Sequence, residues 1–544
     1  MSAMLLTPLA WMVVQLVPTP LGWLSDSVWA STSSALNLPI AGSISVDIGA
    51  TLLAVAMYCA VLATALTVAA LASDKRSAAG TLYLLTAMAA TVAATEIARD
   101  LGYCRRLESA GVEVGSVLVA AIGIVMSCSL LIGLHGQLSR KRMRPGATIA
   151  FIGTMAGLVV CTVSLLISGD DAGLFAAFFG AGVPVSMFAI RTWSLRKWGR
   201  LGVLATASMA LIGFLAVTPI KTDADPALAL SHEQSPAAEL LLSNVPPLGT
   251  GAGSLQDVLP VYRGLNAPAA LPSVTAAAVI ASEMGRSFLW LLVVALAIAA
   301  AALIRSASTR RRDYVYAAGG AGILLAFSLL IFVYSNVLGL PASLLAGVAL
   351  GLAWAQARAG KEYAGLAQEA AGPDRATYAM HQGGAHPRQR AIRLACGAFA
   401  LLLMVQACWI LIPGFYLSRG LPGAQVAAGG AAARSTNLDK AASLALVRGK
   451  LWGNSALASA ALMENDPAAS SGSVSIRERL VRALVYAPYQ PEIWLKLAQL
   501  ADQFKWTRYD AMALLKMVYY TGAGDIDLVP LRTKLALRLD DVVA

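Results

Sequence analysis

Residues Pro246–Gly264 read Pro-Pro-Leu-Gly-Thr-Gly-Ala-Gly-Ser-Leu-Gln-Asp-Val-Leu-Pro-Val-Tyr-Arg-Gly and lie in the longest polar interval between the apolar segments of the chain. Glycines occupy alternate positions in it, at Gly249, Gly251 and Gly253. Because glycine has no Cβ, such a run lets the backbone turn sharply and approach a ligand closely. Arg263 follows, and an arginine in a loop can hold an anion through two parallel hydrogen bonds. This stretch is therefore either a binding loop for an anionic ligand or a plain connecting loop.

The composition around this interval decides the class of protein. Of the 544 residues, 58% are hydrophobic and 13% are charged, and the mean hydropathy is +0.67. A soluble domain has about a quarter charged residues, so we expect a polytopic membrane protein. The net charge of +11 is concentrated in short loops between apolar segments, as the positive-inside rule requires. We therefore expect membrane lipids among the partners and no nucleic acid.

The cysteines and histidines do not suggest a metal or redox centre. All of the six cysteines except Cys104 lie within apolar segments, and none has CxxC or metal-ligand spacing. The four histidines are scattered along the chain. We expect no disulfide framework, no metal and no cofactor.

Eleven segments meet the length of about 20 mostly apolar residues that a membrane helix needs. They are Met4–Leu24, Ile48–Leu71, Ala78–Ile97, Val114–Leu134, Ala147–Ile167, Gly173–Ile190, Leu201–Ile220, Ser287–Leu303, Tyr316–Val337, Pro341–Ala355 and Leu394–Phe415. Prolines interrupt the first segment, which is either a kinked span or a re-entrant segment. The fold class that this pattern predicts is an all-α, polytopic transmembrane helical bundle with about eleven spans.

Lysines and arginines are unevenly divided between alternate loops, and this predicts the orientation. One set of loops holds twenty of them and the other set holds six. The rich set should face the cytoplasm. The N-terminus is then cytoplasmic, while the loop with the glycines and the C-terminal tail lie on the outer side, which is the periplasm if the membrane is a bacterial inner membrane.

The chain divides into five predicted regions. These are N-terminal membrane helices (1–220), a large outer loop (221–285), C-terminal membrane helices (286–415), a linker (416–440) and a helical tail (441–544). Four amphipathic stretches in the tail have helical periodicity: Ile476–Tyr486, Pro491–Phe504, Tyr509–Tyr520 and Leu528–Leu539. The middle two resemble a tetratricopeptide pair, and the alternative is a small helical cap.

Several short motifs, in order, resemble the O-antigen ligase and O-antigen polymerase-like membrane proteins of bacterial surface polysaccharide assembly. The similar stretches are Gln15–Trp23, Ile44–Thr51, Pro247–Ser254 with Tyr262 and Arg263, Glu283–Gly285, Arg310–Asp313, Leu340–Pro341, Leu350–Trp354 and, for one branch of the family, Ala487–Trp494 with Tyr520–Gly522. Two family elements are missing. Pro272–Ala277 contains no His-Asn pair, and Ser168–Asp171 carries two carboxylates where members have Ser-Arg-Gly.

The resemblance implies a function and a site. Such enzymes move glycan from a polyprenyl-pyrophosphate donor to an acceptor hydroxyl, alongside other polysaccharide assembly proteins. Arg263 would stabilise the leaving pyrophosphate and Glu283 would take the hydroxyl proton. Gly249, Gly251, Gly253 and Tyr262 would bind the substrate.

Other interpretations remain open. Arg263 is alternatively a solvated or lipid-contacting residue, and Glu283 a residue that stabilises the start of the following helix. The whole chain is alternatively a non-catalytic relative that serves as a membrane scaffold or glycan-binding partner. A transporter is a third hypothesis, although we see neither an intramembrane chain of ionisable residues nor a repeated half.

Overall fold

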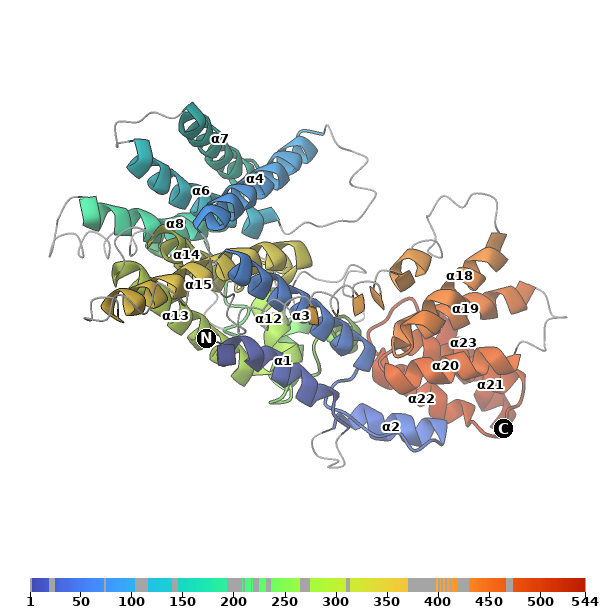
Figure 1. Ribbon diagram of the computed structural model, residues 1–544. Helices are drawn as coiled ribbons and strands as arrows, with labels where there is room; N and C mark the ends of the chain where they lie inside the picture. Colours follow the sequence, from blue (N-terminus) through green and yellow to red (C-terminus); the bar gives the residue numbers. More distant parts are fainter. Residues whose placement is uncertain are drawn as a thin grey trace.

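The protein is all-helical throughout the residues that the computed structural model describes, with 21 helices (Figure 1). The described residues are 2–18, 25–72, 75–102, 116–138, 145–192, 208, 211–216, 218, 225–230, 236–264, 274–309, 314–369, 398–399, 402, 405–406, 409–410, 412–417, 430–465 and 473–543.

Among the described residues, seven helices are long and apolar enough to cross a membrane, and they confirm a multi-pass membrane protein. They are α3 (Ile48–Leu71), α4 (Lys75–Asp100), α6 (Ser116–Leu138), α7 (Pro145–Ile167), α8 (Asp171–Thr192), α13 (Arg286–Thr309) and α15 (Leu340–Glu369). Each corresponds to one of the eleven predicted spans. The predicted spans Leu201–Ile220 and Leu394–Phe415 lie partly outside the described residues.

Two predicted spans are shorter than expected. α1 (Ser2–Leu16) ends two residues before Pro18, because a proline disfavours the helical conformation in the residue before it. Pro8 lies inside α1 without ending it.

The second short span is α14 (Tyr314–Leu330), which has 17 residues and is buried along most of its length, between α6, α8, α13 and α15. Small residues allow this, since a Cβ on Gly180 of α8 would lie 2.6 Å from the carbonyl oxygen of Gly322.

Short helices cover one end of this bundle. They are α2 (Ser27–Leu36), α10 (Pro236–Asn244), α11 (Leu255–Val258), the 3₁₀ helix η1 (Leu259–Tyr262), α12 (Ala276–Met284) and η2 (Asn336–Leu338). The start of α12 is hydrogen-bonded to the residues just after α14. The amide of Ala277 donates to the carbonyl oxygen of Ile331 (2.7 Å), and the amide of Ala276 donates to that of Tyr334 (2.9 Å). The sequence analysis did not predict α2.

The tail contains six helices, α18 (Gly430–Ala445), α19 (Gly449–Asn465), α20 (Ser473–Tyr486), α21 (Pro491–Gln503), α22 (Ala511–Thr521) and α23 (Val529–Val543). The last four confirm the four amphipathic stretches as helices. Helices adjacent in sequence pack together, most extensively α18 on α19, α19 on α20 and α21 on α22.

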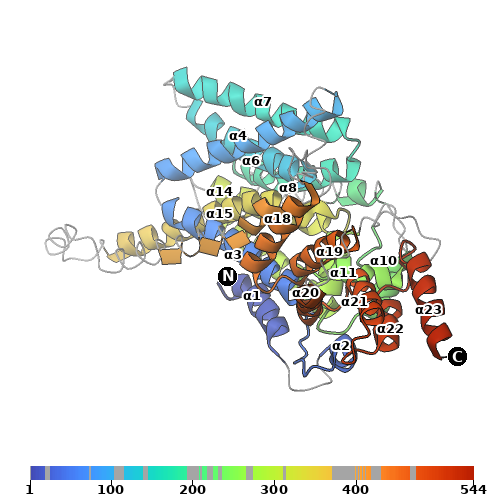
Figure 2. The same ribbon diagram turned by 90° about the vertical axis from the view of Figure 1, so that its right-hand side faces the viewer.

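One apolar core joins the outer loop to the tail. It includes Trp29 of α2, Leu241 of α10, Ile280 of α12 and Trp494 of α21. α2 lies against α20 and α22, and it runs along the tail in both ribbon views (Figures 1 and 2). The tail therefore rests on the same end of the membrane bundle as residues Pro246–Gly264, which we call the glycine loop.

Candidate functional site

The glycine loop adopts a conformation that needs glycine. Gly249, Gly251 and Gly253 have φ angles of +78°, +106° and +81°. These values lie in a region that side chains with a Cβ rarely adopt. A Cβ on Gly249 would collide with the carbonyl oxygen of Glu283, and one on Gly251 would lie 2.5 Å from the Oγ of Ser45. The close approach expected from the sequence is thus made to the protein's own backbone.

The backbone amides of the loop are paired within the protein. Those of Thr250 and Gly251 donate to the carbonyl oxygens of Ser282 and Glu283, each at 3.0 Å. The amide of Ala252 donates to the Oε1 of Gln15 at 3.2 Å. The loop in turn accepts a hydrogen bond from the amide of Val46 at the carbonyl oxygen of Thr250, at 3.0 Å. Substrate binding by these glycines stays a prediction. These paired amides do not point at a ligand, so a substrate would contact the outside surface of the loop.

Gln15 holds the two sides of the site together. Its side chain is buried and donates to the carbonyl oxygens of Leu248 (2.9 Å) and Glu283 (2.8 Å) while it accepts from Ala252. One turn earlier on α1, the indole of Trp11 donates to the carbonyl oxygen of Met284 at 2.9 Å. The end of α1 therefore fixes the position of both the glycine loop and the end of α12.

Glu283 lies at the end of α12 with its carboxyl group directed at the glycine loop. This carboxyl accepts hydrogen bonds from the amides of Gly253 and Leu255, the latter at 3.2 Å. Burial raises the pKa of Glu283 to about 7, although the two amides favour the charged form. A carboxyl group with such a pKa can exchange a proton near neutral pH, which a general base or acid must do.

Tyr262 belongs to a cluster of hydroxyl groups between the glycine loop, α2 and the tail. Tyr489 shares a hydrogen bond with Tyr520, whose hydroxyl group lies 2.9 Å from the Oγ of Ser27. Burial and the nearby carboxylate of Asp26 raise the pKa values of Tyr262 and Tyr489, so both stay neutral at physiological pH. Tyr520 is 42% exposed, so the cluster reaches the surface.

Arg263 ends η1 beside this cluster. Its backbone touches the tail, because a Cβ on Gly524 would collide with the carbonyl oxygen of Arg263. Arg263 thus lies near the C-terminal end of the glycine loop, against the tail, whereas Glu283 contacts the first half of the loop from the end of α12.

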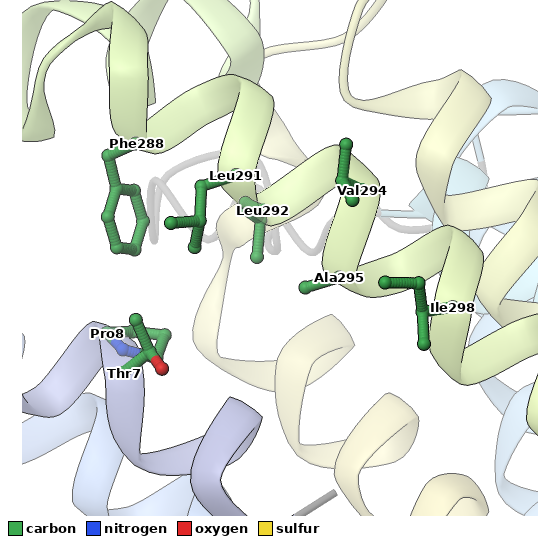
Figure 3. Close-up of a pocket in the computed structure, with 8 residues that line it drawn as sticks. All are labelled: Thr7, Pro8, Phe288, Leu291, Leu292, Val294, Ala295 and Ile298. Atoms are coloured by element: carbon green, nitrogen blue, oxygen red, sulfur yellow. The ribbon is translucent and has the colours of Figure 1, made fainter.

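An apolar groove runs between α1 and α13 (Figure 3). It has a volume of about 200 Å³ and is lined by Thr7, Pro8, Phe288, Leu291, Leu292, Val294, Ala295 and Ile298. Figure 3 shows the side chains of Phe288 and Leu291 directed toward Pro8 and Thr7 of α1, and Ile298 at the far end of the groove. From Phe288 to Ile298 the groove follows α13 for about 15 Å. At the Phe288 end of the groove, this ring packs on Trp11, with ring centroids 5.5 Å apart.

The sequence analysis missed several of these residues. It quoted Gln15 and Tyr489 only inside longer motifs, and it did not assign a role to Trp11 or Phe288. An amphipathic pattern does not identify which polar residue of α1 is buried, because the partners of Gln15 lie more than 230 positions further along the chain.

Comparisons of the chain with protein-family models, curated proteins and solved structures found no match. The assignment of a function therefore depends on the residues of this chain and on the geometry of this site.

Proposed function

We propose that the protein acts on polyprenyl-pyrophosphate-linked glycan at the outer face of a bacterial inner membrane, as a ligase or polymerase of surface polysaccharide assembly. The observation that carries this proposal is the apolar groove between α1 and α13, whose Phe288 packs on Trp11, which in turn donates a hydrogen bond to the carbonyl oxygen of Met284, the residue after Glu283. A polyprenyl chain is apolar and stays within the bilayer, so a groove along α13 suits it. Its head group would then lie at the depth of the glycine loop.

In this proposal Glu283 accepts the proton of the acceptor hydroxyl. A general base contributes about 10²–10⁴-fold to the rate, and it works best when its pKa lies near the working pH. The pKa of Glu283, about 7, meets that condition. The carboxyl group is already positioned by the amides of Gly253 and Leu255, so little reorientation precedes proton transfer.

Arg263 supplies the positive charge for the leaving pyrophosphate. A cation held at the place where negative charge develops stabilises the transition state. The contact of Arg263 with Gly524 of the tail fixes the backbone of Arg263, so the guanidinium starts from a defined position.

The Tyr262 cluster provides the surface for the sugars. Neutral tyrosines offer a flat apolar face and a hydroxyl group that both donates and accepts, and carbohydrates present both kinds of surface. Ser27, Asp26 and Tyr520 add further polar groups at the same place. The tail is then part of the glycan site, with its helices arranged in pairs as in tetratricopeptide proteins.

A second candidate, the non-catalytic membrane scaffold, is favoured by a different observation. The amides of the glycine loop and the carboxyl of Glu283 satisfy one another, as the parts of a purely structural junction do. In that case the groove and the tail would bind lipid-linked glycan or assembly partners without chemistry.

The two candidates differ in the behaviour of Glu283→Gln, a change that keeps the shape of the side chain. Deletion of the gene should change the banding of surface polysaccharide, and the wild-type gene should restore it. If the protein is the enzyme, Glu283→Gln fails to restore the bands although the variant protein is made in normal amount. Arg263→Lys then restores them only in part, because a lysine lacks the planar guanidinium that binds an anion through two hydrogen bonds. Arg508→Ala, a change on the tail at an exposed residue, serves as the control and should restore them fully. Full restoration by Glu283→Gln would favour the scaffold, and unchanged banding after deletion would refute both.

A further inference from the structure

The turn between α18 and α19 is fixed against the start of a membrane helix. A Cβ on Gly49, in the first turn of α3, would lie 2.7 Å from the carbonyl oxygen of Val447. The Nζ of Lys450 lies 2.7 Å from the Oδ1 of Asp257, which ties the same turn to the glycine loop. Because α3 is long and apolar enough to span the membrane, this turn lies close to the depth at which the apolar layer of the bilayer begins.

α18 also contacts the end of the predicted span Leu394–Phe415. The Nζ of Lys440 lies 6.0 Å from the centre of the Tyr416 ring, a cation–π contact. Tyr416 directly follows that span, and the side chain of Phe415 beside it is 52% exposed. Residues 440–447 therefore lie between the ends of two apolar segments.

Two leucines in residues 440–447 are exposed. Leu444 is 44% exposed and lies one turn after Lys440 on the same face of α18. Leu446 follows the last residue of α18 and is 62% exposed. The indole of Trp452 donates to its carbonyl oxygen at 2.7 Å, which helps to hold its backbone in place.

The backbone of Leu446 has a conformation that leucine rarely adopts. Its φ is +54°, in the left-handed region, where a helix commonly ends on glycine because a Cβ is strained there. Leucine at this position is thus unfavourable for the backbone, and most of its side chain is not covered by the protein. Packing among the described residues does not account for this leucine, so we looked for a partner outside the chain.

We propose that Leu444 and Leu446 insert into the lipid leaflet beside α3, so that the phospholipid bilayer is a binding partner of the tail. The lipid-facing surface of α3 continues to this turn, since only 22% of the apolar stretch of α3 is buried within the protein. Lys440 is exposed on the face that carries Leu444, which places a positive charge where lipid phosphates lie. This contact would hold the tail against the membrane whether or not the protein carries out the reaction proposed above.

Site-directed photo-crosslinking of the full-length protein tests the contact. The photoreactive residue p-benzoylphenylalanine replaces Leu444 or Leu446 in protein held in nanodiscs of phosphatidylethanolamine and phosphatidylglycerol. Mass spectrometry after irradiation should show phospholipid adducts at both positions. Cross-links to protein alone at these positions would overturn the proposal.

Val474, at the start of α20, provides the matched control because it is apolar and 50% exposed. α20 packs back along α19, whose 17 residues span about 25 Å, so Val474 lies at the end of this pair away from the turn. In Figure 1 the pair α19 and α20 extends away from the membrane helices. The photoreactive residue at position 474 should give at least about tenfold less phospholipid adduct, and equal labelling at positions 446 and 474 would contradict a specific insertion.

Hydrogen exchange measures what the insertion contributes, through the opening of residues 446–452 in the same nanodiscs. Asparagine adopts a positive φ more readily than leucine, so Leu446→Asn should reduce this opening if residue 446 faces only water. If the side chain lies in lipid, the loss of apolar burial should instead increase the opening about threefold to tenfold. Val474→Asn should leave it unchanged. An unchanged or reduced opening in Leu446→Asn would refute the insertion.

Discussion

Substitution of Gly251 by alanine should destabilise the protein more than the same change at the neighbouring glycine. Gly251 has a φ of +106°, and a side chain held in such a region costs about 1–3 kcal/mol. The new Cβ would also lie 2.5 Å from the Oγ and 2.7 Å from the Cα of Ser45. Overpacking of this kind costs about 1–3 kcal/mol more. The total loss in the free energy of unfolding should be about 2–6 kcal/mol.

Thermal unfolding of the purified protein in detergent measures this loss, with two alanine variants for comparison. Gly253→Ala has a φ of +81° but its Cβ would lie 3.1 Å from its nearest neighbour, so it should cost only the backbone strain, about 1–2 kcal/mol. A Cβ on Gly182 of α8 would meet nothing within 4 Å, and alanine there should be neutral or stabilising. If Gly251→Ala unfolds at the same temperature as Gly253→Ala, the contact between the glycine loop and Ser45 is not what holds the loop.

Three further predictions concern stability. Gln15→Ala should cost about 2–4 kcal/mol in the free energy of unfolding, because three backbone groups each lose a hydrogen bond and those of Leu248 and Ala252 depend on it, and thermal unfolding should show it. The pKa of Glu283 is raised to about 7, so the stability due to its carboxyl should be complete below about pH 4.3 and fall as the pH rises through 7, and denaturation of Glu283→Gln should lack this slope. Arg532 is 2% exposed and donates to the carbonyl oxygen of Gly522 at 2.8 Å, so Arg532→Met should lower the unfolding temperature of the tail, whereas Arg508→Met, at an exposed residue, should change it little.

The membrane helices were predictable because a bilayer imposes their length and composition. Seven of the predicted spans are long apolar helices. The exceptions have physical causes. α14 ends at Leu330, short of the predicted Val337, and the carbonyl oxygens beyond its end receive the amides that begin α12. Such tertiary hydrogen bonds leave no trace in hydropathy.

The candidate site was predictable only in part. Alternate glycines correctly indicated an unusual backbone, but they did not reveal that the backbone approaches Ser45 and Glu283. α18 was read partly as a linker because it begins with Gly-Ala-Ala-Ala, a composition that suits both a flexible linker and a closely packed helix. α2 was missed because a ten-residue helix with several serines has a weak pattern, although Trp29 and Leu36 anchor it in the core. Most of the predicted arginine-rich loops lie outside the described residues.

The central claim, that the protein binds a polyprenyl-pyrophosphate-linked glycan, is tested most directly by photolabelling. A polyprenyl pyrophosphate with a diazirine in its isoprenoid chain is irradiated with the full-length protein in nanodiscs, and the labelled peptides are identified by mass spectrometry. We predict that the label falls on α1 and α13, at residues such as Thr7, Leu291 and Ala295, that excess unlabelled polyprenyl pyrophosphate removes it, and that Ala295→Trp, which fills the groove, abolishes it. Label spread evenly over the lipid-facing helices, including α7, and unaffected by Ala295→Trp would contradict the claim.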